Sequence, residues 1–186
     1  MPRKVVASTY VTLDGFIDEP GQWSFPFWSE EASNFKAREL EGSDALLLGR
    51  LTYEGFAAAW PTMEAEAGQF GAKMNSMPKH VASRTLDSAT WNATIIKGDV
   101  ADAVRALKQE DGGDLLISGS GQLIDLLTGH DLIDEYRLMI HPFVLGNGTK
   151  RLFDRAPRRT LTLVDTVSFP TGVVVNTYQP APAPSD

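Results

Sequence analysis

Short apolar runs alternate along this chain with stretches whose apolar residues recur at helical spacing, and this alternation restricts the fold more than any other feature. Runs of this length, rich in β-branched residues, are typical of buried strands. Strands that alternate with helices form a mostly parallel sheet, because each helix carries the chain back across it. The pattern therefore predicts an α/β domain with helices on both faces of the sheet. Strands are expected at residues 4–11, 45–48, 79–83, 93–97, 115–118 and 135–142.

The end of the chain departs from this alternation. Residues 161–169 and 173–178 both have the composition of strands and flank Pro170-Thr171-Gly172, which predicts a hairpin. Such a hairpin adds an antiparallel edge to an otherwise parallel sheet. Residues 180–186 are rich in proline and alanine and predict a disordered tail after a single domain over residues 1–179.

Four helices are expected between the strands. The first begins at Ser29, and the third has Asp99 as its N-cap and the clearest one-sided apolar stripe of the chain. Pro61 is expected to end the second helix, because proline removes a helical hydrogen bond, and residues 62–78 have no clear pattern. The fourth helix follows Gly121 directly.

Three short segments fall where predicted parallel strands end. They are Gly49-Arg50, Ser83-Arg84-Thr85 and Gly119-Ser120-Gly121. Ligands of open α/β sheets bind outside the carboxyl ends of the strands, and a helix N-terminus with adjacent glycines suits a phosphate group. A lone Gly-X-Gly is also an ordinary turn between a strand and a helix. The three segments together favour a nucleotide site at this edge of the sheet.

Composition limits the classes of partner. A formal net charge of −7 argues against nucleic acid or an anionic membrane surface. The absence of cysteine excludes disulfides, thiolate metal ligands and a cysteine nucleophile, and the three histidines have no metal-ligand spacing, so no metal is expected. Because no stretch resembles a signal peptide or a membrane span, a cytoplasmic protein is expected.

Five segments carry a resemblance to a known family. SDALLLGRLTYEGF (43–56), VASRT (81–85) and LLISGSGQLIDLL (115–127), in this order, resemble the dihydrofolate-reductase-like fold. HPFVLGNGTKRLF (141–153) and STYVTLDGFI (8–17) resemble the C-terminal reductase domain of the bifunctional riboflavin-biosynthesis deaminase-reductase. The resemblance implies a three-layer α/β/α fold with a mixed, mostly parallel sheet and a C-terminal antiparallel hairpin, in a free-standing bacterial member of the family.

The resemblance also implies an NADPH-dependent reductase, with a homodimer expected, that transfers hydride to a small planar heterocycle, pyrimidine-like or pterin-like. The residues that it places around the cofactor are Ala7, Ile17, Gly49, Arg50, Leu51, Thr52, Ser83, Arg84, Thr85, Ser118, Gly119, Ser120, Gly121, Gln122 and Leu123. Arg84 suits the 2′-phosphate, which distinguishes NADPH from NADH. The substrate pocket is expected to include Asp14, Trp23, Phe27, Trp28 and Tyr53.

The catalytic proton source is the least defined part of this hypothesis. Glu31 stands four residues before Phe35, where dihydrofolate reductases carry an acidic residue, and burial beside aromatic rings would raise its pKa. An acid in a first helical turn is also explained by the helix dipole alone. The aromatic cluster between Trp23 and Trp28 is open to two interpretations, a stacking wall for a flat substrate or a hydrophobic plug or dimer contact. A non-catalytic nucleotide sensor or interaction module, and a flavin-binding protein, remain as alternatives.

Overall fold

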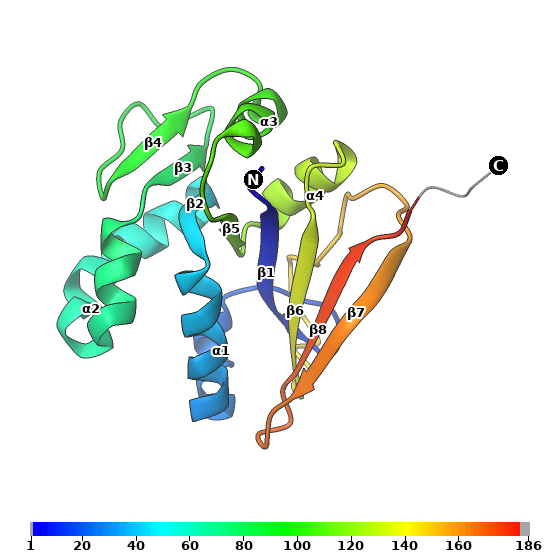
Figure 1. The fold of residues 1–186 in the computed structure, drawn as a ribbon. Coiled ribbons are helices and arrows are strands. Elements are labelled where there is room, and N and C mark those ends of the chain that lie inside the picture. The colour runs from blue at the N-terminus through cyan, green and yellow to red at the C-terminus, as the bar shows by residue number, and fades with distance from the viewer. Residues whose placement is uncertain (1, 183–186) are drawn as a thin grey trace.

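Eight strands form one sheet in the computed structural model, which describes residues 2–182 (Figure 1). The strands are β1 (Val5–Thr12), β2 (Ser43–Gly49), β3 (Lys79–Ala82), β4 (Ala93–Ile96), β5 (Asp114–Ser118), β6 (Glu135–His141), β7 (Leu161–Ser168) and β8 (Val174–Pro180). The helices are α1 (Glu30–Glu41), α2 (Arg50–Ser76), α3 (Val100–Gln109) and α4 (Gly121–Gly129), with two short 3₁₀ turns, η1 (Pro20–Gln22) and η2 (Phe25–Phe27), before α1.

The order of strands in the sheet is β4-β3-β2-β5-β1-β6-β8-β7. All neighbours from β4 to β6 are parallel, whereas β8 is antiparallel to both β6 and β7. The mixed, mostly parallel sheet with a C-terminal antiparallel hairpin is therefore confirmed. Each parallel connection crosses over through a helix or a long loop, as parallel pairing requires.

Helices cover both faces of the parallel part of the sheet (Figure 1). On one face, α1 and α2 pack through Leu40, Tyr53 and Met74 against side chains of β1, β2, β3 and β5. On the other face, α3 and α4 pack through residues such as Val104 and Leu127 against the alternate side chains of β1, β2 and β5. Because strand side chains alternate between faces, a strand buried on both sides must be apolar throughout. This explains the continuous apolar run of β2.

The second helix does not end where the sequence predicted. It continues through Pro61 to Ser76 and is interrupted at Gly68, whose φ of 57° and ψ of −132° are not helical. Pro61 is exposed, and the ring of Trp60 packs on that of Phe70 with centroids 5.5 Å apart. Contacts between the two halves of α2 thus outweigh the hydrogen bond that proline removes. Local sequence carries no signal for this, because those contacts form only after the chain reverses at Gly68.

The first residues of the predicted disordered tail are part of the ordered fold. Pro180 closes β8, and the backbone N–H of Ala181 donates to the carbonyl of Thr160 at 3.0 Å. The rest of the predicted tail, residues 183–186, lies outside the described residues. Within residues 2–182, none of the helices has both the length and the apolar character that a bilayer crossing requires.

Candidate nucleotide site

The carboxyl ends of the central strands meet at one edge of the sheet. Gly49, the last residue of β2, pairs with Ala82, the last residue of β3, so Ser83 follows at the same level. Ser118, the last residue of β5, pairs with Ser8 of β1. The three segments singled out in the sequence therefore lie along one edge, as strand order and direction require.

The Gly119-Ser120-Gly121 turn has a backbone that most residues avoid. Gly119 has φ of 77° and Ser120 has φ of 66°, both in the left-handed region. Glycine adopts this conformation without strain, whereas serine is strained there, and strained residues of this kind concentrate at functional sites. The N–H of Gly119 donates to the carbonyl of Ser8 at 3.2 Å, which ties the turn to β1.

Ser120 connects the start of α4 with the start of α2. Its Oγ accepts a hydrogen bond from the N–H of Gly49 at 2.8 Å and donates to Oγ1 of Thr52 at 2.8 Å. A Cβ on Gly49 would lie 3.0 Å from Ser120 Oγ, so glycine permits the close approach of β2 to the turn. The starts of α2 and α4 are therefore held together by one hydroxyl group.

The helices that begin at this edge differ from the other two at their N-termini. In α1 and α3, the side chains of Ser29 and Asp99 accept hydrogen bonds from the amides of Ala32 and Asp102. No side chain caps α2 or α4 in this way. The first amides of a helix have no intrahelical acceptor and carry partial positive charge. Two uncapped N-termini side by side thus form a place suited to an anion such as a diphosphate.

A second loop closes over the turn. The side chain of Ile17 packs so tightly on Gly121 that a Cβ there would lie 2.7 Å from Ile17 Cδ1. Two carboxylates anchor this loop to residues 145–150: Asp14 accepts from the amides of Leu145 and Gly146, and Asp18 accepts from the amide of Lys150. The hydrogen bond that Asp14 receives from the hydroxyl of Thr12, together with the amide bonds, lowers the pKa of Asp14 to about 2. The Asp14 carboxylate, which the sequence placed in the substrate pocket, therefore has a structural role in holding this loop.

The two arginines expected around the cofactor, Arg50 and Arg84, are both exposed. Arg50 forms an ion pair with Glu54 one turn further along α2 at 3.2 Å. Arg84 makes no hydrogen bond or ion pair with any residue between 2 and 182. Ser83 organises the turn around Arg84, because its Oγ accepts from the amides of Thr85 and Leu86. Arg84 is therefore presented on an ordered turn with its guanidinium free for a ligand.

The other residues expected around the cofactor differ in burial. Ala7 and Leu123 are buried in the core beneath the turn and can contact a ligand only through their backbone. Leu51 and Gln122 are exposed in the first turns of α2 and α4, and Ser118 is half-buried at the end of β5. The sequence thus predicted which backbone segments meet at this edge better than it predicted the burial of their side chains.

The aromatic residues before α1 form a plug around a histidine. Trp23 is 5% exposed, its indole N–H donates to the carbonyl of Asp18 at 2.7 Å, and its ring lies 5.1 Å from that of His141. Phe27 also packs edge-on against His141, with centroids 5.9 Å apart. Burial lowers the pKa of His141. Of the two interpretations left open by the sequence, these contacts favour the plug, whereas Trp28 lies exposed beside it.

Two residues with proposed roles in chemistry have other contacts. Glu31 is exposed in the first turn of α1, and hydrogen bonds from its own backbone amide and from Ser29 lower its pKa. The burial on which a raised pKa depended does not occur, and of the two explanations left open by the sequence the helix dipole accounts for this carboxylate. Tyr53 is buried in the core, where its hydroxyl accepts from the amide of Thr90 at 2.8 Å. Its contacts are those of a core residue and not of a pocket wall.

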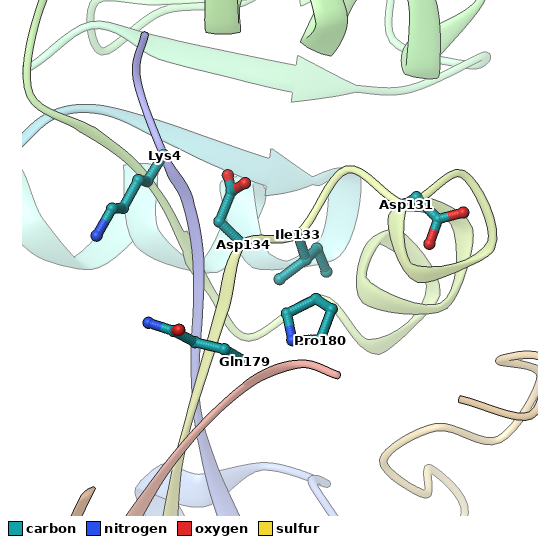
Figure 2. Close-up of a pocket in the computed structure, with 6 residues that line it drawn as sticks. All are labelled: Lys4, Asp131, Ile133, Asp134, Gln179 and Pro180. Atoms are coloured by element: carbon teal, nitrogen blue, oxygen red, sulfur yellow. The ribbon is translucent and has the colours of Figure 1, made fainter. Parts of the chain in front are cut away.

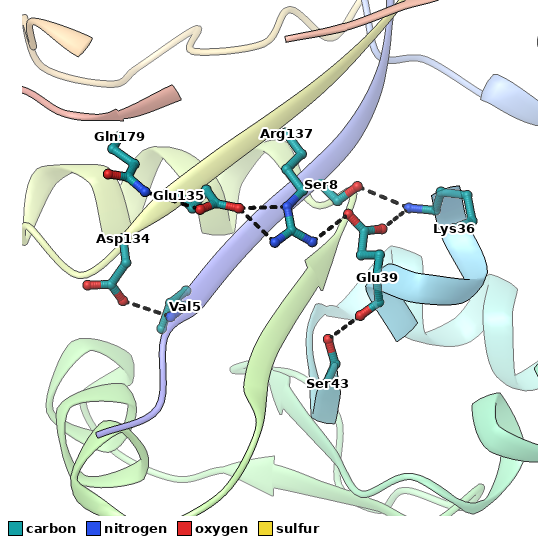
Figure 3. A network of polar contacts seen from close by, with 9 residues as sticks. All are labelled: Val5, Ser8, Lys36, Glu39, Ser43, Asp134, Glu135, Arg137 and Gln179. Carbon is teal, nitrogen blue, oxygen red and sulfur yellow. Dashed lines mark hydrogen bonds and ion pairs between the residues drawn. The ribbon is translucent and has the colours of Figure 1, made fainter. Parts of the chain in front are cut away.

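The sequence interpretation overlooked a buried polar network beside the turn (Figure 3). Lys36 of α1 donates a hydrogen bond to Ser8 Oγ at 3.0 Å and forms an ion pair with Glu39. Glu39 forms a second ion pair with Arg137 of β6 at 3.4 Å. Arg137 is bound in turn by Glu135 at 2.7 Å. A charged residue in the middle of a predicted strand, as in EYRLMIH, was the available signal.

Away from this edge of the sheet, the part of the chain that the structure describes has few features suited to binding a ligand. An open hollow of about 460 Å³ lies at the amino ends of β1 and β6, with Lys4 and Asp134 on its wall (Figure 2). Asp134 is already bound to Lys108 at 2.6 Å and to the amide of Val5 at 2.8 Å. Within residues 2–182, no group of three His, Asp or Glu side chains is placed to hold a metal ion.

Comparison with known proteins agrees with this architecture. The YyaP protein of Bacillus subtilis strain 168, itself uncharacterized, is 30% identical over 181 residues, which cover 95% of this chain and 94% of YyaP. The crystal structure of a Shewanella sp. PV-4 protein provisionally assigned to riboflavin biosynthesis superposes with a TM-score of 0.76 at 22% identity, covering 98% of this chain and 100% of that one. Dihydrofolate reductase from Enterococcus faecalis, solved in complex with NADP(H), superposes with a TM-score of 0.65 at 15% identity and covers 95% of this chain and 96% of its own.

The family model described as the RibD C-terminal domain matches residues 3–175. This range includes all strands from β1 to β7 and all four helices. The dihydrofolate-reductase-like α/β fold expected from the sequence is confirmed by the structures that superpose on it. The chain belongs to the RibD C-terminal domain family and is reductase-like.

Proposed function

We propose that the protein is an NADPH-dependent reductase that transfers hydride to a small planar heterocycle, pyrimidine-like or pterin-like. The observation that carries the proposal is the pair of uncapped helix N-termini, α2 and α4, held together by the Ser120 hydroxyl at the carboxyl edge of the sheet. The Enterococcus dihydrofolate reductase, which shares the fold, was solved with NADP(H).

The residues at this edge fit a dinucleotide. The first-turn amides of α4 and the Gly119-Ser120-Gly121 backbone would hold the diphosphate, because no side chain caps this helix N-terminus. Arg84 would contact the 2′-phosphate from its ordered turn. The bound cofactor would supply the hydride, and the protein would position the cofactor and the substrate. The buried plug around His141 would exclude water from their surroundings.

Titration of the purified protein with NADPH and with NADH, followed by tryptophan fluorescence, tests the proposal. We expect micromolar binding of NADPH and much weaker binding of NADH. Arg84→Ala should weaken NADPH by at least about tenfold and leave NADH nearly unchanged, because only NADPH carries the phosphate that Arg84 contacts. Arg105→Ala, which changes an exposed arginine on α3, is the matched control and should alter neither affinity.

Either of two results would refute the assignment. Absence of NADPH binding to folded protein would mean that the turn is only structural. Equal weakening of both cofactors by Arg84→Ala would remove the 2′-phosphate role from this residue.

A non-catalytic nucleotide sensor is the second candidate, and the position of Glu31 favours it. Its exposed carboxylate, with a lowered pKa, is ionised at neutral pH and holds no proton to donate. The two functions separate in one assay, in which NADPH absorbance is followed with a panel of pterins, pyrimidines and flavins. Oxidation that depends on one of them supports the reductase, whereas tight NADPH binding without oxidation by any member supports the sensor.

A further inference from the structure

Two loop segments, one after β1 and one after β6, pair with each other beside the start of α4. Phe16 lies opposite Arg151 in an isolated antiparallel bridge. Next to this bridge, the amide of Ile17 donates to the carbonyl of Lys150 at 2.9 Å, so these two residues are also opposite each other. In an antiparallel pair, opposed side chains share one side and successive side chains alternate between the two sides. Ile17 and Lys150 therefore project to one side of the pair, and Phe16 and Arg151 project to the other.

The side that carries Ile17 and Lys150 faces α4. A Cβ on Gly121, the first residue of α4, would lie 2.7 Å from Cδ1 of Ile17. Leu152, two residues after Lys150 and thus on the same side, packs against the core cluster that contains Leu123 of α4. The long side chain of Lys150 therefore extends from the loop pair toward the N-terminus of α4, where no side chain caps the first amides.

The opposite side carries a second cation with different contacts. The guanidinium of Arg151 lies 4.3 Å from the centre of the Phe16 ring, and it donates to the backbone carbonyl of Asp14 at 3.2 Å. These contacts hold Arg151 on the side away from α4. Lys150 and Arg151 are thus two exposed cations, adjacent in the sequence, that the loop pair directs to opposite sides.

The ammonium of Lys150 is without a partner among residues 2–182. The interactions of Lys150 are made by its backbone, because its carbonyl accepts from Ile17 and its amide donates to the carboxylate of Asp18. That carboxylate is also bound by the amide and the hydroxyl of Thr149. An ordered backbone with a free ammonium is suited to binding an anion, since the backbone is already fixed before the ligand arrives.

We propose that Lys150 binds the diphosphate of the dinucleotide cofactor. The proposal rests on the proposed function, in either its reductase or its sensor form, because both place a dinucleotide at this edge of the sheet. The first-turn amides of α4 would contact the diphosphate from the helix, and Lys150 would contact it from the loop pair. With a formal net charge of −7, the protein as a whole repels an anionic dinucleotide, so cations at the site carry the attraction.

This role predicts a pattern of affinities that differs from that of Arg84. NADPH and NADH share the diphosphate, so Lys150→Ala should weaken both by the same factor, about tenfold for loss of one charged contact. Arg84→Ala should weaken NADPH alone. Lys150→Arg keeps the charge and should restore most of the affinity. Isothermal titration calorimetry of each variant with both cofactors measures these changes, and circular dichroism confirms that each variant is folded.

Arg151→Ala is the matched control. It removes a neighbouring exposed cation from the side that faces away from α4, so the affinities for NADPH and NADH should both stay unchanged. An equal loss of affinity in Arg151→Ala and Lys150→Ala would mean that only the total charge of the loop matters, and this would overturn the assignment.

Two fragments of the cofactor locate the contact. ADP-ribose contains the diphosphate without the 2′-phosphate, and adenosine 2′-monophosphate contains the 2′-phosphate without the diphosphate. Lys150→Ala should weaken only ADP-ribose, and Arg84→Ala should weaken only adenosine 2′-monophosphate. Unchanged binding of ADP-ribose to Lys150→Ala, with NADPH bound by the unmodified protein, would overturn the role of Lys150 and leave the proposed function standing. Absence of NADPH binding to the unmodified, folded protein would refute the proposed function, and the role of Lys150 with it.

Discussion

At the scale of the residue, the most unusual group is a lysine buried without a counter-ion. Lys79, at the start of β3, is 1% exposed, and its ammonium donates to the carbonyl of Asn75 at 2.8 Å. The ring of Trp91 lies 4.0 Å from the same nitrogen. No carboxylate within residues 2–182 forms an ion pair with it, and burial lowers the pKa of Lys79 to about 8. The charge is therefore retained at neutral pH at a cost in stability.

This lysine predicts a pH dependence of folding. The unfolded chain keeps its lysine protonated up to the ordinary pKa of 10.5, whereas the folded protein loses the proton near pH 8. Since the unfolded state then binds more protons, the free energy of unfolding should rise with pH between about 8 and 10.5. Urea unfolding at pH 7.5 and pH 9.5 measures this rise, and Lys79→Met should abolish the part that Lys79 contributes. An identical rise in the variant would contradict the assignment.

At the scale of the element, α2 shows how close packing can outweigh the low helix propensity of individual residues. Its two halves, before and after Gly68, fold back on one another. A Cβ on Gly71 would lie 2.9 Å from the Cα of Glu64, so the absence of a side chain at this position lets the halves touch. The side-chain amide of Asn75 also donates to the backbone carbonyl of Trp60 at 3.2 Å. Glycine is thus required here for approach of the backbone.

Two glycines of the same helix should respond oppositely to alanine. Gly71→Ala should lower the free energy of unfolding by about 1–3 kcal/mol, because its methyl group meets backbone that cannot move away easily. Gly55→Ala should raise it by about 0.5–1 kcal/mol, since nothing lies within 4 Å of the added carbon and alanine favours the helix. Chemical denaturation of both variants checks the prediction. Similar effects of the two changes would show that the halves do not pack as described.

At the scale of the whole molecule, one carboxylate joins a helix to the centre of the sheet. Glu39 is 1% exposed on its side chain and binds Lys36 of its own helix and Arg137 of β6 (Figure 3). Lys36 also reaches Ser8 of β1, whose carbonyl holds the Gly119 amide. The network thus connects α1, β1 and β6 to the candidate nucleotide site.

Removal of this carboxylate should affect the fold as a whole. Glu39→Gln leaves two buried cations without their shared anion, so we expect the free energy of unfolding to fall by about 3 kcal/mol or more. Glu41→Gln changes an exposed acid at the end of the same helix and should stay within about 0.5 kcal/mol. Thermal or urea unfolding compares the two. A loss confined to NADPH affinity, with unchanged stability, would mean that the network serves the site alone.

The sequence by itself determined the order and type of the elements. Strand runs, the Asp99 cap and the hairpin around Pro170-Thr171-Gly172 are local signals, because a strand, a cap or a turn depends on residues that are neighbours in the chain. The parallel sheet followed from their alternation, and with it the edge where Gly49 and Ser120 meet. The resemblance and the family comparison agree on this frame.

Only the tertiary structure decided which side chains that frame exposes or buries. Glu31 lies in solvent and Tyr53 in the core, and Asp14 holds a loop more than a hundred residues away. The continuation of α2 through Pro61 was likewise not predictable from the local sequence. Burial, pairing of charges and contact between distant segments are properties of the folded arrangement, and the spacing of residues along one chain does not contain them.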